Sequence, residues 1–259
     1  MATLEPARVV ITGLSSGIGR ALALHLASQG ARVAGIHLDR DPQVTEQLVN
    51  DIEAAGGEAL IRVGTTTSTA DVEALAEAAV QRWGGIDGWV NNAAQILVRP
   101  FLELTDDDWR ELLDVNLMGY VRGARAAARY MVPARGGTIV NVGSAVEIMP
   151  PSDMTAYVTA KGGVSGLTRA LAVELGPAGI TVNVVAPGAT ETPLNANTWT
   201  DDVRATYRQR IPLRRIAAPD DIAAAIAVFL SPDARYVTGQ VVMVDGGLTL
   251  DGSVGHKPV

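Results

Sequence analysis

The first thirty residues combine a short strand, a glycine-rich turn and a helix, and this order restricts the fold more than any other feature. A β-branched run at 8–11 precedes Thr12-Gly13-Leu14-Ser15-Ser16-Gly17-Ile18-Gly19, and a helix-forming stretch follows, ending near Gly30. Gly13 permits a sharp turn, and Gly17 and Gly19 let backbone N–H groups and the helix N-terminus approach a pyrophosphate. The glycine spacing differs from that of the commonest dinucleotide fingerprint. A turn that only packs the strand on the helix is the alternative.

The rest of the chain alternates strand-like and helix-like segments, which predicts a parallel sheet covered on both faces. The expected strands are 9–12, 32–37, 58–64, 88–90, 138–142, 181–186 and 241–244. The expected helices are 17–29, 42–55, 69–83, 106–131, 155–175 and 219–230. We therefore expect an α/β fold in one domain, 1–259: a doubly wound, Rossmann-type parallel sheet of about seven strands.

Residues 189–212 interrupt this alternation with a segment that is polar at its centre. An insertion after the sixth strand is a suitable place for a substrate lid, because a lid closes over bound substrate and excludes water. The alternative interpretation is a plain surface helix.

Tyr157 and Lys161 lie four residues apart, so a helix over 155–175 places both on one face. An ammonium beside a phenol stabilises the phenolate and lowers the tyrosine pKa. A tyrosine with a lowered pKa can act as a general acid or base on a carbonyl or alcohol oxygen. Ser144 can donate a hydrogen bond to the same oxygen and stabilise charge developing there. The alternative is a half-buried tyrosine beside a surface lysine.

Further motifs occur in a recognisable order. They are Asn91-Asn92-Ala93 after a strand, Asn116 within Asp114-Val115-Asn116-Leu117-Met118-Gly119, Ser144 thirteen positions before Tyr157, Pro187-Gly188 with Thr192-Pro193, and Asp245-Gly246-Gly247. Together with the glycine turn and the Tyr157–Lys161 pair, they resemble the classical short-chain dehydrogenase/reductase family over residues 8–247.

The resemblance implies an NAD(P)-dependent oxidoreductase that transfers a hydride between nicotinamide and a secondary alcohol or ketone. It implies a catalytic set of Asn116, Ser144, Tyr157 and Lys161, in which Asn116 anchors a relay water and Lys161 also contacts the nicotinamide ribose. The implied cofactor-binding residues are Gly13, Ser15, Ser16, Gly17, Ile18, Gly19, His37, Leu38, Asp39, Thr65, Asn92, Ala93, Ala94, Tyr157, Lys161, Pro187, Gly188, Thr190 and Thr192.

The cofactor type is left open by the end of the second strand. His37 stands where NAD-dependent relatives usually carry Asp, and the basic residues typical of NADP-dependent relatives are missing at Ser16 and Leu38. Asp39 and Arg40 follow, and either charge could reach the ribose. The nearby carboxylate favours NAD(H) slightly, and NADP(H) remains open.

Composition excludes several other classes of function. A net charge of −7 without a basic cluster argues against nucleic acid as a partner. The absence of cysteine excludes disulfides and thiolate chemistry, and three scattered histidines predict no metal site. The apolar stretch 222–230 is too short to span a bilayer, and the N-terminus does not resemble a secretory signal. We expect a cytoplasmic protein without membrane contact.

The substrate is less constrained than the chemistry. Segments 187–196, 211–213 and 237–250 look most like glucose 1-dehydrogenases, and Glu147 and Asn195 are the candidate contacts for a sugar or polyol. A reductase of 3-oxoacyl carrier proteins is an alternative, with Arg122, Arg125 and Arg129 as its only docking candidates. A cofactor-binding regulator without turnover is another.

The resemblance implies a homotetramer, because similar enzymes associate as dimers and, more often, as tetramers. The apolar strand 241–244 ends the sheet, and the two long helices carry many small residues that permit close approach of a second copy. The tail from Leu248 to Val259 is expected near a subunit boundary or a neighbouring active site. The alternative is that the small residues pack only within the chain.

Overall fold

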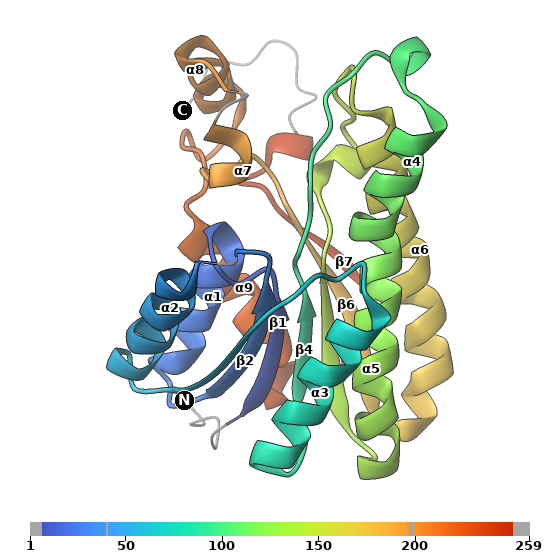
Figure 1. The fold of residues 1–259 in the computed structure, drawn as a ribbon. Helices are drawn as coiled ribbons and strands as arrows, with labels where there is room; N and C mark the ends of the chain where they lie inside the picture. The colour runs from blue at the N-terminus through green and yellow to red at the C-terminus, as the bar shows by residue number, and fades with distance from the viewer. Residues whose placement is uncertain (1–6, 40, 197–198, 251–259) are drawn as a thin grey trace.

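Seven parallel strands form the central sheet of the protein (Figure 1). The structure, a computed structural model, describes residues 7–39, 41–196 and 199–250. The strand order is β3-β2-β1-β4-β5-β6-β7. The strands are β1 (Arg8–Thr12), β2 (Arg32–His37), β3 (Glu58–Val63), β4 (Gly88–Asn91), β5 (Gly137–Val142), β6 (Ile180–Pro187) and β7 (Val241–Val244). The predicted doubly wound α/β class is confirmed.

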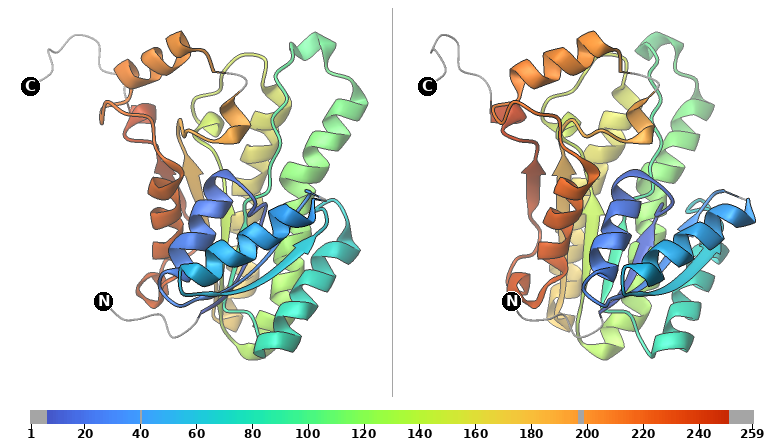
Figure 2. Two further views of the ribbon diagram at one scale, coloured as in Figure 1. Left: turned by 60° about the vertical axis from the view of Figure 1, so that its left-hand side comes forward. Right: turned by 90° about the vertical axis from the view of Figure 1, so that its left-hand side faces the viewer.

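Helices cover both faces of the sheet (Figures 1 and 2). One face carries α1 (Gly17–Ala27), α2 (Pro42–Ala54) and α9 (Pro219–Leu230), and the other carries α3 (Thr69–Trp83), α5 (Gly119–Ala134) and α6 (Thr155–Leu175). Each helical layer has its own apolar core against the sheet. The five central strands are almost entirely buried, as expected for a parallel sheet covered twice, whereas the edge strands β3 and β7 are partly exposed.

The chain reverses direction across the sheet between β1 and β4. It builds β2 and β3 on one side of β1 and then returns to form β4 on the other side. In open α/β sheets, ligands bind outside the carboxyl ends of the strands at such a switch point. This topology therefore places the glycine turn after β1 beside the asparagines that end β4.

The helix predicted at 106–131 is not continuous. Its first part is α4 (Asp106–Leu113), which Thr105 and Asp108 begin with a reciprocal capping box. One turn of π-helix follows over Asp114–Met118, and α5 then continues to Ala134. A wide turn of this kind inside a helix often occurs at a functional site.

Two short helices, α7 (Pro193–Ala196) and α8 (Asp201–Arg210), occupy the segment 189–212. Thr200 caps α8 by accepting a hydrogen bond from the backbone N–H of Val203 at 3.3 Å. Both helices lie beyond the carboxyl ends of the strands (Figure 2). Residues 197 and 198 lie outside the described residues. In the part of the chain that the structure describes, no helix meets the length and apolarity needed to cross a membrane.

A buried chain of polar side chains joins the sheet to α5 and α6. Asn91 Oδ1 accepts from Trp89 Nε1 at 2.8 Å, Asn91 Nδ2 donates to Asn141 Oδ1 at 2.8 Å, and Asn141 Nδ2 donates to Thr168 Oγ1 at 2.9 Å. Gly123 on α5 gives this chain its space, because an added Cβ would lie 2.1 Å from Asn91 Oδ1. Burying a polar group without a hydrogen bond costs free energy, so a displacement of α5 that broke this network would destabilise the fold.

We predict that Gly123→Ala destabilises the protein by about 1–3 kcal/mol, because the methyl group must displace Asn91 or the helix. Urea unfolding at a fixed protein concentration measures the effect. The matched control is Gly136→Ala, since a Cβ there meets nothing within 4 Å and its φ is not positive. Equal stability for the two variants would contradict the role given to Gly123.

Candidate active site

A cavity of about 1040 Å³ opens at the carboxyl end of the sheet. Residues at the ends of six strands line it, from the segments after β1, β2, β3, β4, β5 and β6. The predicted site residues that line it are Gly13, Ser15, Ser16, Gly17, Ile18, His37, Leu38, Asp39, Thr65, Asn92, Ala93, Ala94, Ser144, Tyr157, Lys161, Pro187, Gly188, Thr190, Thr192 and Asn195. Gly19, Asn116 and Glu147 do not line it.

The glycine turn has the shape that a pyrophosphate requires. Gly13 and Gly17 have φ angles of +69° and +53°, which favour glycine. An added Cβ at Gly19 would lie 2.2 Å from the carbonyl oxygen of Gly13, so Gly19 packs behind the turn instead of lining the cavity. Ser16, the N-cap residue of α1, makes no side-chain capping bond to the first turn. The first N–H groups of α1 therefore remain available for an anion at the helix N-terminus.

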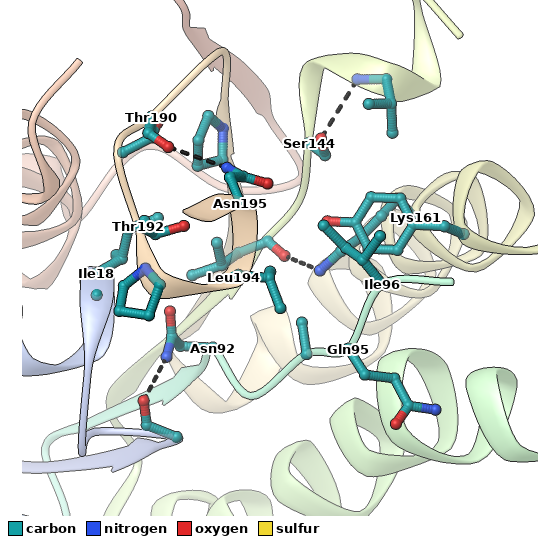
Figure 3. Close-up of a pocket in the computed structure, with 18 of the residues that line it drawn as sticks. Ile18, Asn92, Gln95, Ile96, Ser144, Lys161, Thr190, Thr192, Leu194 and Asn195 are labelled. Atoms are coloured by element: carbon teal, nitrogen blue, oxygen red, sulfur yellow. Dashed lines mark hydrogen bonds between the residues drawn. The ribbon is translucent and has the colours of Figure 1, made fainter. Parts of the chain in front are cut away.

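Hydrogen bonds fix this turn to the end of β4. Thr12 Oγ1 accepts from the backbone N–H groups of Asn92 and Ala93 at 3.0 and 3.1 Å. Asn92 Nδ2 donates to the carbonyl oxygen of Gly13 at 3.0 Å (Figure 3) and to that of Thr12, also at 3.0 Å. Ala94, where the resemblance would place glycine, does not have a positive φ, so its side chain adds no backbone strain.

The end of β2 forms one end of the cavity. His37 is buried; its Nε2 shares a hydrogen bond with Thr45 Oγ1 at 3.0 Å, and its Nδ1 has no partner among the described residues. Burial lowers the His37 pKa, and the charge of Asp39 acts in the opposite direction. Leu38 is 72% exposed, and Arg40 lies outside the described residues. A buried, unpaired nitrogen beside a carboxylate fits the ribose end of a dinucleotide.

Tyr157 lies in the middle of the cavity, on the first turn of α6. Its ring packs with Ile96, Val146 and Met154 and is 7% exposed. Burial raises the Tyr157 pKa to about 12, and a hydrogen bond with Ser144 acts in the opposite direction. The sequence-based expectation of a lowered tyrosine pKa is therefore wrong for this arrangement, because desolvation of the phenolate outweighs its neighbours.

Lys161 is fully enclosed and does not donate to Tyr157. Its Nζ donates to the carbonyl oxygen of Val142 at 2.7 Å (Figure 3). It also donates to the hydroxyl of Tyr120 at 3.0 Å. It lies 5.7 Å from the centre of the Tyr157 ring. Burial lowers the Lys161 pKa to about 7, and the charge of Glu147 opposes this shift.

Asn116 lies in the π-helical turn, and its side chain holds the segment that follows β4. Its Oδ1 accepts from the backbone N–H of Gln95 at 2.9 Å, and its Nδ2 donates to the Gln95 carbonyl at 2.8 Å. Both ends of the amide are thus engaged by one residue. The relay water that the resemblance implies for Asn116 stays a prediction.

Glu147 faces away from the substrate space. Its Oε2 accepts a hydrogen bond of 2.6 Å from Ser165 Oγ on α6. The expected contact of Glu147 with a polyol is not supported, because the short helical turn after Ser144 directs this carboxylate toward α6, and Glu147 does not line the cavity. Asn195 does line the cavity, where its Nδ2 donates to the Thr190 carbonyl at 3.0 Å (Figure 3).

The segment over Tyr157 is more apolar than the sequence suggested. Met149, Trp199 and Tyr207 pack on an apolar cluster at the base of α8, and the rings of Trp199 and Tyr207 lie 5.0 Å apart between centres with their planes tilted by 42°. The missed lining residues on this side are Ile96, Met149, Pro150, Pro151, Met154, Leu194, Trp199, Asp202, Val203, Thr206, Tyr207, Arg210 and Leu248. Positions 199, 203, 206, 207 and 210 recur at helical spacing, which is the signal that could have identified this face.

Comparison with known proteins agrees with this geometry. The family model described as enoyl-(acyl carrier protein) reductase matches residues 13–249. The 3beta-hydroxysteroid dehydrogenase 1 of Eggerthella lenta is 38% identical over 249 residues, 95% of both chains. The 3-oxoacyl-(acyl-carrier-protein) reductase of Thermotoga maritima is 37% identical over 247 residues, covering 95% of this chain and 99% of its own.

Solved structures are equally similar. A putative short-chain alcohol dehydrogenase from Sinorhizobium meliloti superposes with a TM-score of 0.90 at 33% identity, over 96% of this chain and 98% of its own. A gluconate 5-dehydrogenase from Burkholderia cenocepacia, solved with NADP and tartrate, has a TM-score of 0.89 at 32% identity, over 95% and 96%. The chain therefore belongs to the short-chain dehydrogenase/reductase family and is an NAD(P)-dependent oxidoreductase that acts on hydroxyl and keto groups.

Proposed function

We propose that the chain interconverts a secondary alcohol and a ketone on a bulky, mainly apolar compound, such as a fused-ring alcohol. The observation that carries this proposal is the apolar wall formed by the Trp199–Tyr207 pair and by Met149, which lines the same cavity as Ser144 and Tyr157. A sugar or polyol needs a hydrogen-bonding partner for each hydroxyl group, whereas an apolar ring gains by leaving water. The hydroxysteroid dehydrogenase at 38% identity is a relative with a substrate name of this kind.

Tyr157, Ser144, Lys161 and Asn116 form the proposed catalytic set. A nicotinamide cofactor bound in the cavity accepts or supplies the hydride. Ser144 donates a hydrogen bond to the substrate oxygen, and Tyr157 transfers the proton to or from that oxygen. The buried Lys161 ammonium stabilises the Tyr157 phenolate when the proton leaves, while Asn116 holds the backbone of Gln95 at the side of the cavity.

The cavity residues predicted from the sequence are proposed to hold the dinucleotide. The turn at Gly13 and Gly17 and the start of α1 would bind the pyrophosphate, and Lys161 would contact the nicotinamide ribose. Residues 189–212 would act as a lid over the substrate, within a chain that forms a single domain. An ion pair of 3.0 Å between Arg204 Nε and Glu191 Oε1 joins α8 to the loop after β6.

We infer a preference for NAD(H) from the end of β2. A His37 with a lowered pKa is uncharged at neutral pH; its free Nδ1 can hydrogen-bond a ribose hydroxyl but offers no positive charge to a 2′-phosphate. The Asp39 carboxylate lines the same end of the cavity and would repel that phosphate. Lys161 and Arg210 are the only basic residues among the described ones that line the cavity, and Arg210 contacts Met149 on the substrate side.

A carrier-protein substrate has less support. Arg122 is paired with Asp114 at 2.6 Å, and Arg129 with Glu73 at 2.9 Å, so two of the three candidate docking arginines are already partnered on this chain. Both retained catalytic side chains, Tyr157 and Lys161, argue against a regulator without turnover. The cytoplasmic location expected from the sequence stays a prediction.

We also propose a homotetramer. β7 lies at the edge of the sheet, and Val242 on it and Val228 on α9 are exposed. Gly162 and Gly166 on α6 have nothing within 4 Å of an added Cβ, so internal packing does not require glycine at either position. Small residues at these places would let a helix of a second copy approach closely. Residues 251–259, the expected boundary tail, lie outside the described residues.

Fused-ring secondary alcohols should be oxidised with a kcat/KM at least about tenfold above that for glucose or gluconate.

Tyr157→Phe should lower kcat by about 10²–10⁴-fold with little change in NADH binding, because only the titrating hydroxyl is lost. Cofactor absorbance measures turnover, and Tyr236→Phe, at a fully exposed tyrosine, is the control. A preference for polyols would overturn the substrate proposal, and a Tyr157→Phe enzyme with near wild-type kcat would overturn the mechanism.

NAD should exceed NADP in kcat/KM by about tenfold or more, that is roughly 1.4 kcal/mol. Asp39→Asn should narrow this ratio, since it removes the repulsion of the 2′-phosphate. Glu46→Gln, an exposed carboxylate on α2 outside the cavity, should leave the ratio unchanged. A wild-type enzyme that prefers NADP would show that another group binds the phosphate.

Light scattering behind a sizing column should give the mass of four chains. Gly166→Arg should lower this mass, because a long side chain keeps a second helix away while the protomer has room for it. Ala54→Arg, on the exposed last residue of α2, is the control and should remain tetrameric. A monomer mass for the unaltered protein at micromolar concentration would exclude the assembly.

A further inference from the structure

Tyr120 forms a closed hydrogen-bonded triangle with Lys161 and the end of β5. Its hydroxyl accepts from Lys161 Nζ at 3.0 Å and donates to the Val142 carbonyl at 3.0 Å, and Lys161 Nζ donates to that carbonyl at 2.7 Å. The side chains of both Tyr120 and Lys161 are buried, each residue at 1% exposure. The ammonium also lies 4.9 Å from the centre of the Tyr120 ring. Tyr120 does not line the cavity, so it lies behind Lys161 as seen from the substrate.

A buried ammonium needs acceptors, because its charge has lost the water that stabilised it. Among the described residues, no carboxylate lies within ion-pair distance of Lys161. Glu147 acts on Lys161 only through its charge, while its Oε2 is hydrogen-bonded to Ser165. The Tyr120 hydroxyl is thus one of the two acceptors that the structure gives to Lys161.

We propose that Tyr120 is a positioning residue that keeps Lys161 charged and directed between the Tyr120 and Tyr157 rings. The inference rests on the proposed function, in which Lys161 stabilises the Tyr157 phenolate. The titratable groups around the ammonium are Tyr157 on α6, Tyr120 on α5 and Glu147 on the turn after Ser144. Of these, the Tyr120 hydroxyl is the one that hydrogen-bonds to Lys161.

A purely structural role for Tyr120 makes a different prediction. Its ring packs with Val164, Val184 and Ala186, and its hydroxyl would still be satisfied by Val142 without Lys161. A structural tyrosine would change stability when altered but would leave the protonation of Lys161 unchanged. The pKa of Lys161 therefore separates the two roles.

The sequence permits a direct measurement, because the chain has only two lysines, Lys161 and Lys257. Selective ¹³C labelling of lysine gives two NMR signals, and Lys257→Arg identifies the one that belongs to Lys161. In the protein without cofactor, Tyr120→Phe should lower the Lys161 pKa by about one unit, since the charged form loses an acceptor. The matched control is Tyr130→Phe on the same helix, which should leave this pKa unchanged.

The pH profile should move in the opposite direction. A Lys161 that is less charged stabilises the Tyr157 phenolate less, so the Tyr157 pKa rises. The ascending limb of kcat/KM for alcohol oxidation should then shift up by about one pH unit in Tyr120→Phe, a roughly tenfold loss on that limb. Affinity for NADH, from a fluorescence titration, should change less than about threefold.

Tyr120→Leu, which also lacks the hydroxyl, replaces the Phe variant if that variant does not fold. An unchanged Lys161 pKa in a folded variant without the hydroxyl would overturn the proposal. A shifted Lys161 pKa supports it even if no alcohol is oxidised, in which case the proposed function fails and the positioning role stands.

Discussion

The contact between the ends of β1 and β4 sets the geometry of the whole site. Thr12 and Asn92 exchange backbone and side-chain hydrogen bonds across this junction, and the Gly13 carbonyl accepts one more. Because an added Cβ at Gly13 would meet Ala93 at 2.8 Å, the two turns pack with no room for a side chain between them. The start of α1 and the segment that follows β4 are therefore held in a fixed relation before any ligand arrives, as a preorganised site requires.

Burial shifts the two central titratable groups in opposite directions. In water a tyrosine loses its proton slightly before a lysine does. Here the Tyr157 pKa rises to about 12 and the Lys161 pKa falls to about 7, so the enclosed pair favours the form in which neither side chain is charged. In the proposed mechanism, moving a proton through Tyr157 therefore depends on every group that can stabilise charge on Lys161. A single hydroxyl behind the lysine gains influence from this low-dielectric setting.

The sequence predicted the strands and helices well because their signals are local. Glycine turns, β-branched runs and capping residues such as Thr105 lie next to the elements they define. The break in the helix at Asp114–Met118 was not predicted, since nothing in its composition distinguishes a π-helical turn from an α-helical one. The direction of Glu147 could not be predicted either, because its partner Ser165 is eighteen residues away and comes close only through packing.

For the site, too, local features could be predicted from the sequence and long-range packing could not. Motif residues around the glycine turn and at Tyr157 and Lys161 could be named from the ordered motifs and the family resemblance that they carry, and most of them line one cavity. The Tyr157 pKa was predicted in the wrong direction, because spacing reveals neighbours on a helix but not how much water they have lost. Tyr120 was missed because the sequence shows only that it lies one helical turn beyond Asn116. Its role becomes visible only when the structure places the end of β5 beside its hydroxyl.

Helix α8 supplies Asp202, Val203, Thr206, Tyr207 and Arg210 to the lining of the cavity and yet contains no buried residue. The folding core lies elsewhere, between the sheet and its two helical layers. Substitutions on α8 therefore alter the surface offered to the substrate at little expense in folding free energy. A chain built in this way can acquire new substrates through substitutions on one exposed helix. The buried core that carries the chemistry tolerates fewer substitutions and can stay unchanged.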